Sequence, residues 1–172
     1  MKKGIYLFMT LTGFSFAGMA QSATYHALKV DIDAGAGNKF TLTVEPHYRL
    51  SDKLALGIRF QDAASFTLDF RSEGANNATG TESSSSTSIT ADYYFLDGKS
   101  KRNLVLFAGG GLGGFSESDS RTTNPSTNSL GFFPRVGLET GHFRASIEYN
   151  VTGGTSNYVS LNVGFFVGGG KK

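Results

Sequence analysis

Residues 130–151 read LGFFPRVGLETGHFRASIEYNV, two amphipathic segments joined at Gly141-His142. On both sides of this dipeptide, apolar side chains alternate with polar or very small ones, and a period of two residues is that of a β-strand. Glycine in the first position is typical of a type II′ turn, whose twist matches that of paired strands. The stretch therefore predicts an antiparallel β-hairpin with one apolar face and one polar face.

The two-residue turn also fixes which residues face each other across this hairpin. It places Glu139 opposite Arg144 and Arg135 opposite Glu148, with both pairs on the polar face. Directly opposed side chains have Cβ atoms about 4.5–5.5 Å apart, which is within reach of an ion pair. Two complementary pairs without a clash of like charges favour this register.

A three-residue turn at 51–53 has a similar consequence in an earlier hairpin, where it places Glu45 opposite Arg59. We therefore expect an ion-pair network on the polar face. Its predicted members are Glu45, Arg59, Arg135, Glu139, Arg144 and Glu148. Pro46 and Pro134 fall inside predicted strands, and because proline lacks a ladder donor, a bulge or a local kink is expected at each.

The same alternation recurs through most of the chain and defines eight predicted strands. Their apolar positions run over 28–32, 40–50, 54–60, 89–95, 104–108, 130–138, 143–151 and 159–167. The second, fourth and sixth connections are tight turns, whereas the third (72–88) and fifth (116–128) are long and rich in small polar residues. The serine run at 82–88 is expected to be flexible loop. Short turns opposed to long loops predict an all-β fold, an eight-stranded antiparallel up-and-down transmembrane β-barrel.

Alternation alone does not say which face is outside, because a soluble lipocalin-like barrel has the same period with its apolar face turned inward. Several features favour the membrane arrangement. The polar set mixes both charge signs with glycine and contains little lysine, and aromatic residues gather near the predicted strand ends, as in the interfacial girdles of membrane barrels. The apolar face is therefore predicted to contact lipid, and the polar face to line a crowded lumen.

The first residues have the pattern of a secretory signal peptide: two lysines, an apolar stretch and a small-residue cleavage motif at 18–20. We expect residues 1–20 to be this signal and 21–172 to be a barrel domain in the outer membrane. All 14 acidic residues lie after residue 20 and 2 of the 16 basic ones before it, so the expected mature chain has no net charge. Equal numbers of acidic and basic residues do not indicate nucleic-acid binding. The chain contains no cysteine, which excludes disulfides and thiolate metal sites.

Four segments carry a resemblance to a known family. They are LSDKL at 50–54, ADYYF at 91–95, FPRVGLETGHFR at 133–144 and GFFVGGGKK at 164–172. Together with the signal they resemble the outer-membrane β-barrel domain family, the small eight-stranded OmpX/OmpA-like barrels. The resemblance covers essentially all of the expected mature chain, and it implies a fold rather than a particular activity. It also implies that the aromatic last strand is a barrel-assembly signal, with a GGGKK tail in place of the usual terminal Phe.

One glycine motif could suggest a cofactor. Gly109-x-Gly111-x-x-Gly114 matches the dinucleotide fingerprint in its letters, but no helical pattern follows that could direct its N-terminus at a pyrophosphate. The preferred interpretation is a glycine-rich barrel strand, in which missing side chains let the sheet curl or let lumen side chains pack across. No cofactor is predicted.

The histidines and acidic residues are also weak candidates for chemistry. His26 and His142 fall at the predicted turn end, and His47 lies on the polar face, where a hydrogen-bonded lumen residue is expected. Asp31 and Asp33 share that face, but a lumen with comparable numbers of arginines favours ion pairing over metal binding. No catalytic, cofactor-binding or metal-binding residue is predicted.

The first functional hypothesis is a monomeric, non-enzymatic barrel with a side-chain-filled lumen and a structural or surface-interaction role. Its expected partners are outer-membrane lipid and an extracellular ligand bound through loops 72–88 and 116–129. The alternatives are a narrow porin-like channel for small solutes or ions and a lipid-modifying enzyme. Planar-bilayer conductance separates the first two, and a lipid-hydrolysis assay tests the third.

Overall fold

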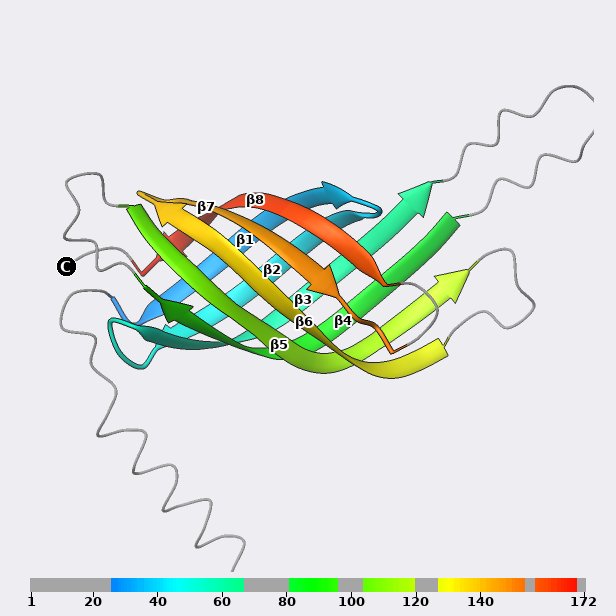
Figure 1. Ribbon diagram of the computed structural model, residues 1–172, viewed down its shortest axis with the longest axis horizontal. Coiled ribbons are helices and arrows are strands. Elements are labelled where there is room, and N and C mark those ends of the chain that lie inside the picture. The colour runs from blue at the N-terminus through cyan, green and yellow to red at the C-terminus, as the bar shows by residue number, and fades with distance from the viewer. Residues whose placement is uncertain (1–25, 67–80, 96–103, 120–126, 154–156, 170–172) are drawn as a thin grey trace, which may run out of the picture.

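A computed structural model describes residues 26–66, 81–95, 104–119, 127–153 and 157–169. The strands are β1 (Leu28–Gly37), β2 (Phe40–Arg49), β3 (Leu54–Phe66), β4 (Thr81–Tyr94), β5 (Leu104–Asp119), β6 (Thr127–Thr140), β7 (Phe143–Asn150) and β8 (Tyr158–Gly168). Each strand pairs antiparallel with the next, and β8 pairs with β1, so the sheet closes into a barrel (Figure 1). The predicted eight-stranded antiparallel barrel is confirmed. None of the described residues forms a helix long and apolar enough to cross a membrane.

The alternation in the sequence becomes an alternation between the outside of the barrel and its lumen. Ile89 and Leu130 point outward and are both 71% exposed, whereas Lys29, Asp31 and Glu45 point inward and are fully buried. The apolar face is therefore outside, as predicted for a membrane barrel, and the soluble arrangement with an apolar interior is excluded.

Exposed aromatic side chains lie toward both ends of this apolar exterior. Those near the end formed by the tight turns, the turn end, are Tyr48, Tyr93, Phe95 and Phe143. Those near the opposite end, the loop end, are Phe40, Phe132 and Tyr149. Amphipathic or aromatic rings at these levels are typical of the two interfaces of a bilayer.

The hairpin between β6 and β7 has the register that its two-residue turn predicts. Glu139 faces Arg144 and Arg135 faces Glu148. Gly141 has a φ of +60°, in the left-handed region that glycine enters without steric cost. Local turn geometry therefore sets the register of this hairpin.

The prolines do not produce the expected bulges. The pairs Arg135–Glu148 and Phe132–Val151 flank Pro134 in one unchanged register. A bulge inserts an unpaired residue and would shift this register, so none is present, and the proline in β2 likewise leaves the β2–β3 register intact. Each proline lacks a backbone N–H donor, and the strand pairing tolerates the loss of this one hydrogen bond.

The expected boundaries of the long loops were wrong. The serine run at 82–88 belongs to β4, where it pairs with β3 on one side and β5 on the other. Residues 116–119 likewise continue β5, and 127–128 begin β6. Serine has a low strand propensity, but backbone pairing on both sides outweighs this preference. The remainders of the expected loops, 67–80 and 120–126, lie outside the described residues, as do 1–25 and 96–103.

The two ends of the barrel differ in height. At the loop end, β3, β4, β5 and β6 extend beyond the other four strands, as the right-hand side of Figure 1 shows. This four-stranded extension is where the reassigned serine run lies.

Candidate functional site

A cluster of charged side chains fills the half of the lumen near the turn end. Five strands, β1, β2, β4, β6 and β7, contribute to it, each through inward positions of the alternating pattern. Its members are Lys29, Asp31, Glu45, His47, Arg49, Asp92, Arg135, Glu139 and Arg144. Four carboxylates meet four lysine or arginine cations, so the charges balance before His47 is counted.

Arg135 joins opposite walls of the barrel. Its guanidinium donates to both carboxylate oxygens of Glu45 at 2.6 and 2.7 Å and to Asp92 at 2.9 and 2.8 Å. Glu45 lies on β2 and Arg135 on β6, four strands apart in a ring of eight. Bidentate pairs of this kind are strong and fix the relative orientation of both groups.

Arg144 and Lys29 extend the cluster toward the turns. Arg144 lies 2.9 Å from Glu139, its predicted partner, and also contacts Asp31 at 3.0 Å and Asp92 at 3.1 Å. The Lys29 ammonium lies 2.5 Å from Glu139 and 3.1 Å from Asp31. Each carboxylate is thus shared between cations, which lowers the cost of burying it.

The other predicted network members have exchanged partners. Arg135 faces Glu148 in the register but pairs with Glu45 across the lumen, while Arg59 lies 2.9 Å from Glu148. The latter contact joins β3 to β7, again on opposite walls. Long arginine side chains reach across a narrow lumen, so the register of neighbouring strands does not decide their ion-pair partners.

His47 lies between two carboxylates. Its Nε2 atom is 3.0 Å from Asp31 and 3.1 Å from Glu45, without the alignment of a hydrogen bond. One ligand atom from each of these three residues lies within 4.8 Å of the others, a spacing that could hold a metal ion. Arg144 and Arg135 already contact the same carboxylates, so a divalent cation would have to displace guanidinium groups. The arrangement favours ion pairing.

Aromatic rings in the lumen were missed by the sequence analysis. They are Tyr94, Phe107, Phe115, Phe133, Tyr158 and Phe166. Cations stack on several of them: Arg49 lies 3.9 Å from the Tyr94 centroid and Arg59 lies 3.8 Å from that of Phe133. Cation–π contacts of this kind stabilise desolvated guanidinium groups. The sequence does contain a pattern that predicts such rings: adjacent aromatic residues at 93–94, 132–133 and 165–166. Because successive side chains of a strand point to opposite faces, one ring of each pair must point into the lumen.

Two glycines make room for these rings. A Cβ atom added at Gly111 would lie 2.7 Å from ring atoms of Phe133, and one added at Gly137 would meet the ring of Phe107. The Gly109–Gly114 motif therefore lies in a barrel strand, β5, in which Gly111 makes room for a lumen ring.

The lumen near the loop end is polar and carries fewer charges than the cluster, among them buried Lys39, which lies 5.2 Å from the centroid of the Tyr158 ring. Tyr158 donates to Gln61 at 2.9 Å, and Gln61 donates to Thr43 at 3.1 Å, which links β8, β3 and β2. Ser84 and Ser86 of β4 are buried there, and their hydroxyls have no hydrogen-bond partner among the described residues. This half of the lumen can accept water, whereas the ion-paired half is closed by side chains.

Two solved structures share this architecture. Neisserial surface protein A matches with a TM-score of 0.59 at 14% sequence identity, over 86% of this chain and 97% of that chain. The N-terminal β-barrel domain of OprF from Pseudomonas aeruginosa matches with a TM-score of 0.57 at 15% identity, over 83% of this chain and 99% of that chain. The chain has the fold of the small outer-membrane β-barrels. No protein-family model and no curated protein matches the sequence.

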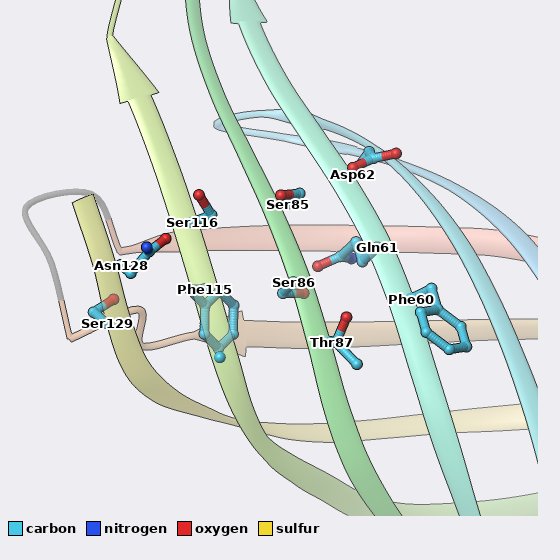
Figure 2. A pocket seen from close by; sticks show the side chains of 11 residues that line it. Phe60, Gln61, Asp62, Ser85, Ser86, Thr87, Phe115, Ser116, Asn128 and Ser129 are labelled. Atoms are coloured by element: carbon cyan, nitrogen blue, oxygen red, sulfur yellow. The ribbon is translucent and has the colours of Figure 1, made fainter. Parts of the chain in front are cut away.

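The outer surface of this outer-membrane barrel fold is hollowed at the loop end. A groove of about 560 Å³ follows β3 to β6, and Figure 2 shows the side chains around it. Asp62, Ser85, Ser116 and Asn128 occupy directly opposed positions on the four strands and form one polar row. We call this hollow the outer groove.

The histidines are dispersed in this outer-membrane barrel fold. His142 is exposed in the β6–β7 turn, where its Nδ1 atom lies 3.2 Å from the Phe166 carbonyl oxygen, and His26 is exposed just before β1. His47 is buried in the charged cluster. The structure thus places His47 against carboxylates and cations rather than beside a serine nucleophile.

Proposed function

We propose that this chain is an integral outer-membrane protein, exported through a signal at 1–20, with a lumen closed by side chains and a structural or surface-interaction role. The observation that carries the proposal is the ion-paired cluster across the lumen. Closed barrels satisfy every backbone group in lipid, and the exposed apolar exterior supports burial in a bilayer.

The cluster argues against the alternative of a narrow channel. Lys29, Asp31, Arg59 and Asp92 are fully buried, and Arg135 and Arg59 each bridge opposite walls. A permeating ion would have to break charge-assisted hydrogen bonds at two levels, and buried pairs lose several kcal/mol when one partner is removed. The native lumen is therefore expected not to conduct.

Planar-bilayer recording tests this proposal. The native chain should show no steady conductance, whereas an Arg59→Ala, Arg135→Ala double variant should open a small cation-selective pathway, because the carboxylates of Glu45 and Glu148 remain. Lys53→Ala, in an exposed turn, is the matched control and should stay silent. Steady conductance by the native chain would establish the channel alternative and overturn the closed-lumen proposal.

A non-enzymatic role is the second part of the proposal. It is supported by the surroundings of His47, whose ring lies among two carboxylates that are themselves paired with arginines. Purified protein should show no hydrolysis of phospholipid or lipopolysaccharide above a heat-denatured control. Hydrolysis that is lost in His47→Gln would instead support the lipid-modifying alternative.

The loop end is the proposed interaction surface. We infer that an extracellular partner would contact the segments 72–88 and 116–129, part of which forms the extension of β3 to β6. Many outward positions there are polar, unlike the band below them. Deletion of 120–126 should remove partner binding while leaving the barrel heat-modifiable in SDS gels. A monomer is expected, since the closed sheet leaves no strand edge among the paired strands.

A further inference from the structure

Gly114 has no packing explanation. Strand β5 contains five glycines, and at four of them an added Cβ atom would meet a neighbouring strand or side chain. At Gly114 it would meet no atom of the described residues within 4 Å. Glycine weakens a strand, and inside one it often marks a bulge, a tight bend or close approach of a ligand or another backbone. The register on both sides of Gly114 is unbroken, so no bulge is present there. Its position inside the outer groove points to a ligand there.

The outer groove begins where the apolar exterior ends. Phe60, Thr87 and Gly114 form its lower row on three paired strands. Exposed Leu130 of β6 follows next to Gly114, just outside the groove. The next row toward the loops is the polar row that contains Asp62. A second hollow of about 450 Å³ continues from it over β2 to β5. The groove thus runs from the lipid-facing band to the polar extension.

The side chains of the groove define the chemistry of its occupant. Hydroxyls, two amides (Gln61 and Asn128) and one carboxylate line it together with apolar side chains, and no lysine or arginine is among the described residues that do so. Such a set both donates and accepts hydrogen bonds, and it lacks the cations that phosphate recognition uses. Phe60 adds an aromatic face at the lipid side. Neutral hydroxyl groups of a sugar ring match this lining better than an anionic headgroup does.

We propose that the outer groove binds the sugar portion of a glycolipid of the outer leaflet, with Asp62 accepting sugar hydroxyls and Gly114 leaving room for the ring. The proposal rests on the proposed outer-membrane location. Continuity of the groove with the lipid-facing band selects a membrane-anchored sugar over a soluble one. An anchored ligand also gains from its high effective concentration at the surface.

Binding of purified lipopolysaccharide to the full-length protein in detergent tests the site. Gly114→Leu places a side chain in the hollow at a position where its Cβ atom meets none of the described residues. Asp62→Asn removes the carboxylate at constant shape. Asp62→Asn should weaken binding roughly tenfold, the loss expected for one hydrogen bond to a charged group. Gly114→Leu should weaken it at least as much, because the leucine side chain occupies the space of the sugar ring. Ala36→Leu, exposed on β1 at the loop end, is the matched control and should bind as the native chain does. Heat-modifiable mobility in SDS gels verifies that all three variants fold.

Three results would overturn the sugar site. They are unchanged lipopolysaccharide binding by Gly114→Leu, equal weakening by Ala36→Leu, and equal competition by phosphatidylglycerol vesicles. Self-association of the native chain that only Gly114→Leu abolishes, with lipopolysaccharide binding unchanged, would assign the groove to a second copy instead. Fractionation of the chain away from the outer membrane would overturn the proposed location itself, so the two failures are distinguishable.

Discussion

Arg135 and Glu45 lie on opposite walls of the lumen and are joined by two hydrogen bonds of 2.6 and 2.7 Å. Neither residue faces the other in any pair of neighbouring strands. The contact exists because the barrel is narrow enough for one guanidinium to cross it. It ties β2 to β6 directly, in addition to the backbone ladders that run around the ring.

Removal of Arg135 should therefore be costly. Arg135→Ala leaves Glu45 buried without its guanidinium partner and removes one of the two arginines that contact Asp92. We expect a loss of about 3–5 kcal/mol in the free energy of unfolding. The Glu45→Ala, Arg135→Ala double variant should lose less than the sum of the single variants, because it leaves no stranded charge on β2. Urea unfolding in lipid vesicles, followed by circular dichroism, measures this coupling. Strictly additive losses would contradict the crossing contact.

The lipid-facing surface predicts a depth dependence. Ile147 and Leu161 oppose each other on β7 and β8 and are both about half exposed. Arginine at either position should cost about 2–4 kcal/mol, whereas Val159→Arg, near the loop end of β8, should cost about 0–1 kcal/mol. The same unfolding assay compares them. Equal costs at Leu161 and Val159 would place the bilayer elsewhere on the barrel.

Two glycines of β5 should respond oppositely to the same substitution. Gly111→Val drives a side chain into the ring of Phe133, and overpacking of this kind costs about 1–3 kcal/mol. Gly114→Val enters open space and should be neutral or stabilising, since valine is the better strand former. Thermal unfolding in detergent distinguishes the pair. A loss at Gly114 equal to that at Gly111 would show that the hollow is not empty of protein.

The β6–β7 turn offers a test of backbone strain without packing effects. Gly141 has a φ of +60°, and an added Cβ atom there meets no atom within 4 Å in the part of the chain that the structure describes. Gly141→Ala should therefore cost about 1–2 kcal/mol from conformation alone. Gly141→Asn should cost less, because asparagine tolerates the left-handed region better. Unfolding midpoints in urea give the comparison, and equal costs for Ala and Asn would count against a conformational origin.

The proposed orientation in the membrane can be tested with single cysteines, since the chain has none of its own. Asn128→Cys, exposed at the loop end, should react with a membrane-impermeant maleimide in intact cells. Lys53→Cys, exposed in a tight turn, should react only after the outer membrane is permeabilised. The reverse pattern would invert the barrel in the membrane.

Much of the fold could be predicted because its signals are local. Alternation with a period of two residues identified the strands, and the two-residue turn at Gly141-His142 set a register that the structure reproduces. The composition of a segment was misleading where strand pairing decided its structure. The serine run at 82–88 has the composition of a loop, yet it pairs with β3 on one side and β5 on the other. Its backbone hydrogen bonds come from strands distant in the sequence, which no local pattern reports.

The sequence by itself determined which residues point into the lumen and which lie on the outside of the barrel, because each strand obeys the same alternation wherever it is placed. Only the tertiary structure decided which of the buried charges meet. Closure of the ring brings Glu45 to Arg135 and Arg59 to Glu148. The physical reason is the length of the arginine side chain, whose guanidinium can cross a lumen this narrow. Which carboxylate it meets depends on strand order, tilt and stagger around the whole barrel.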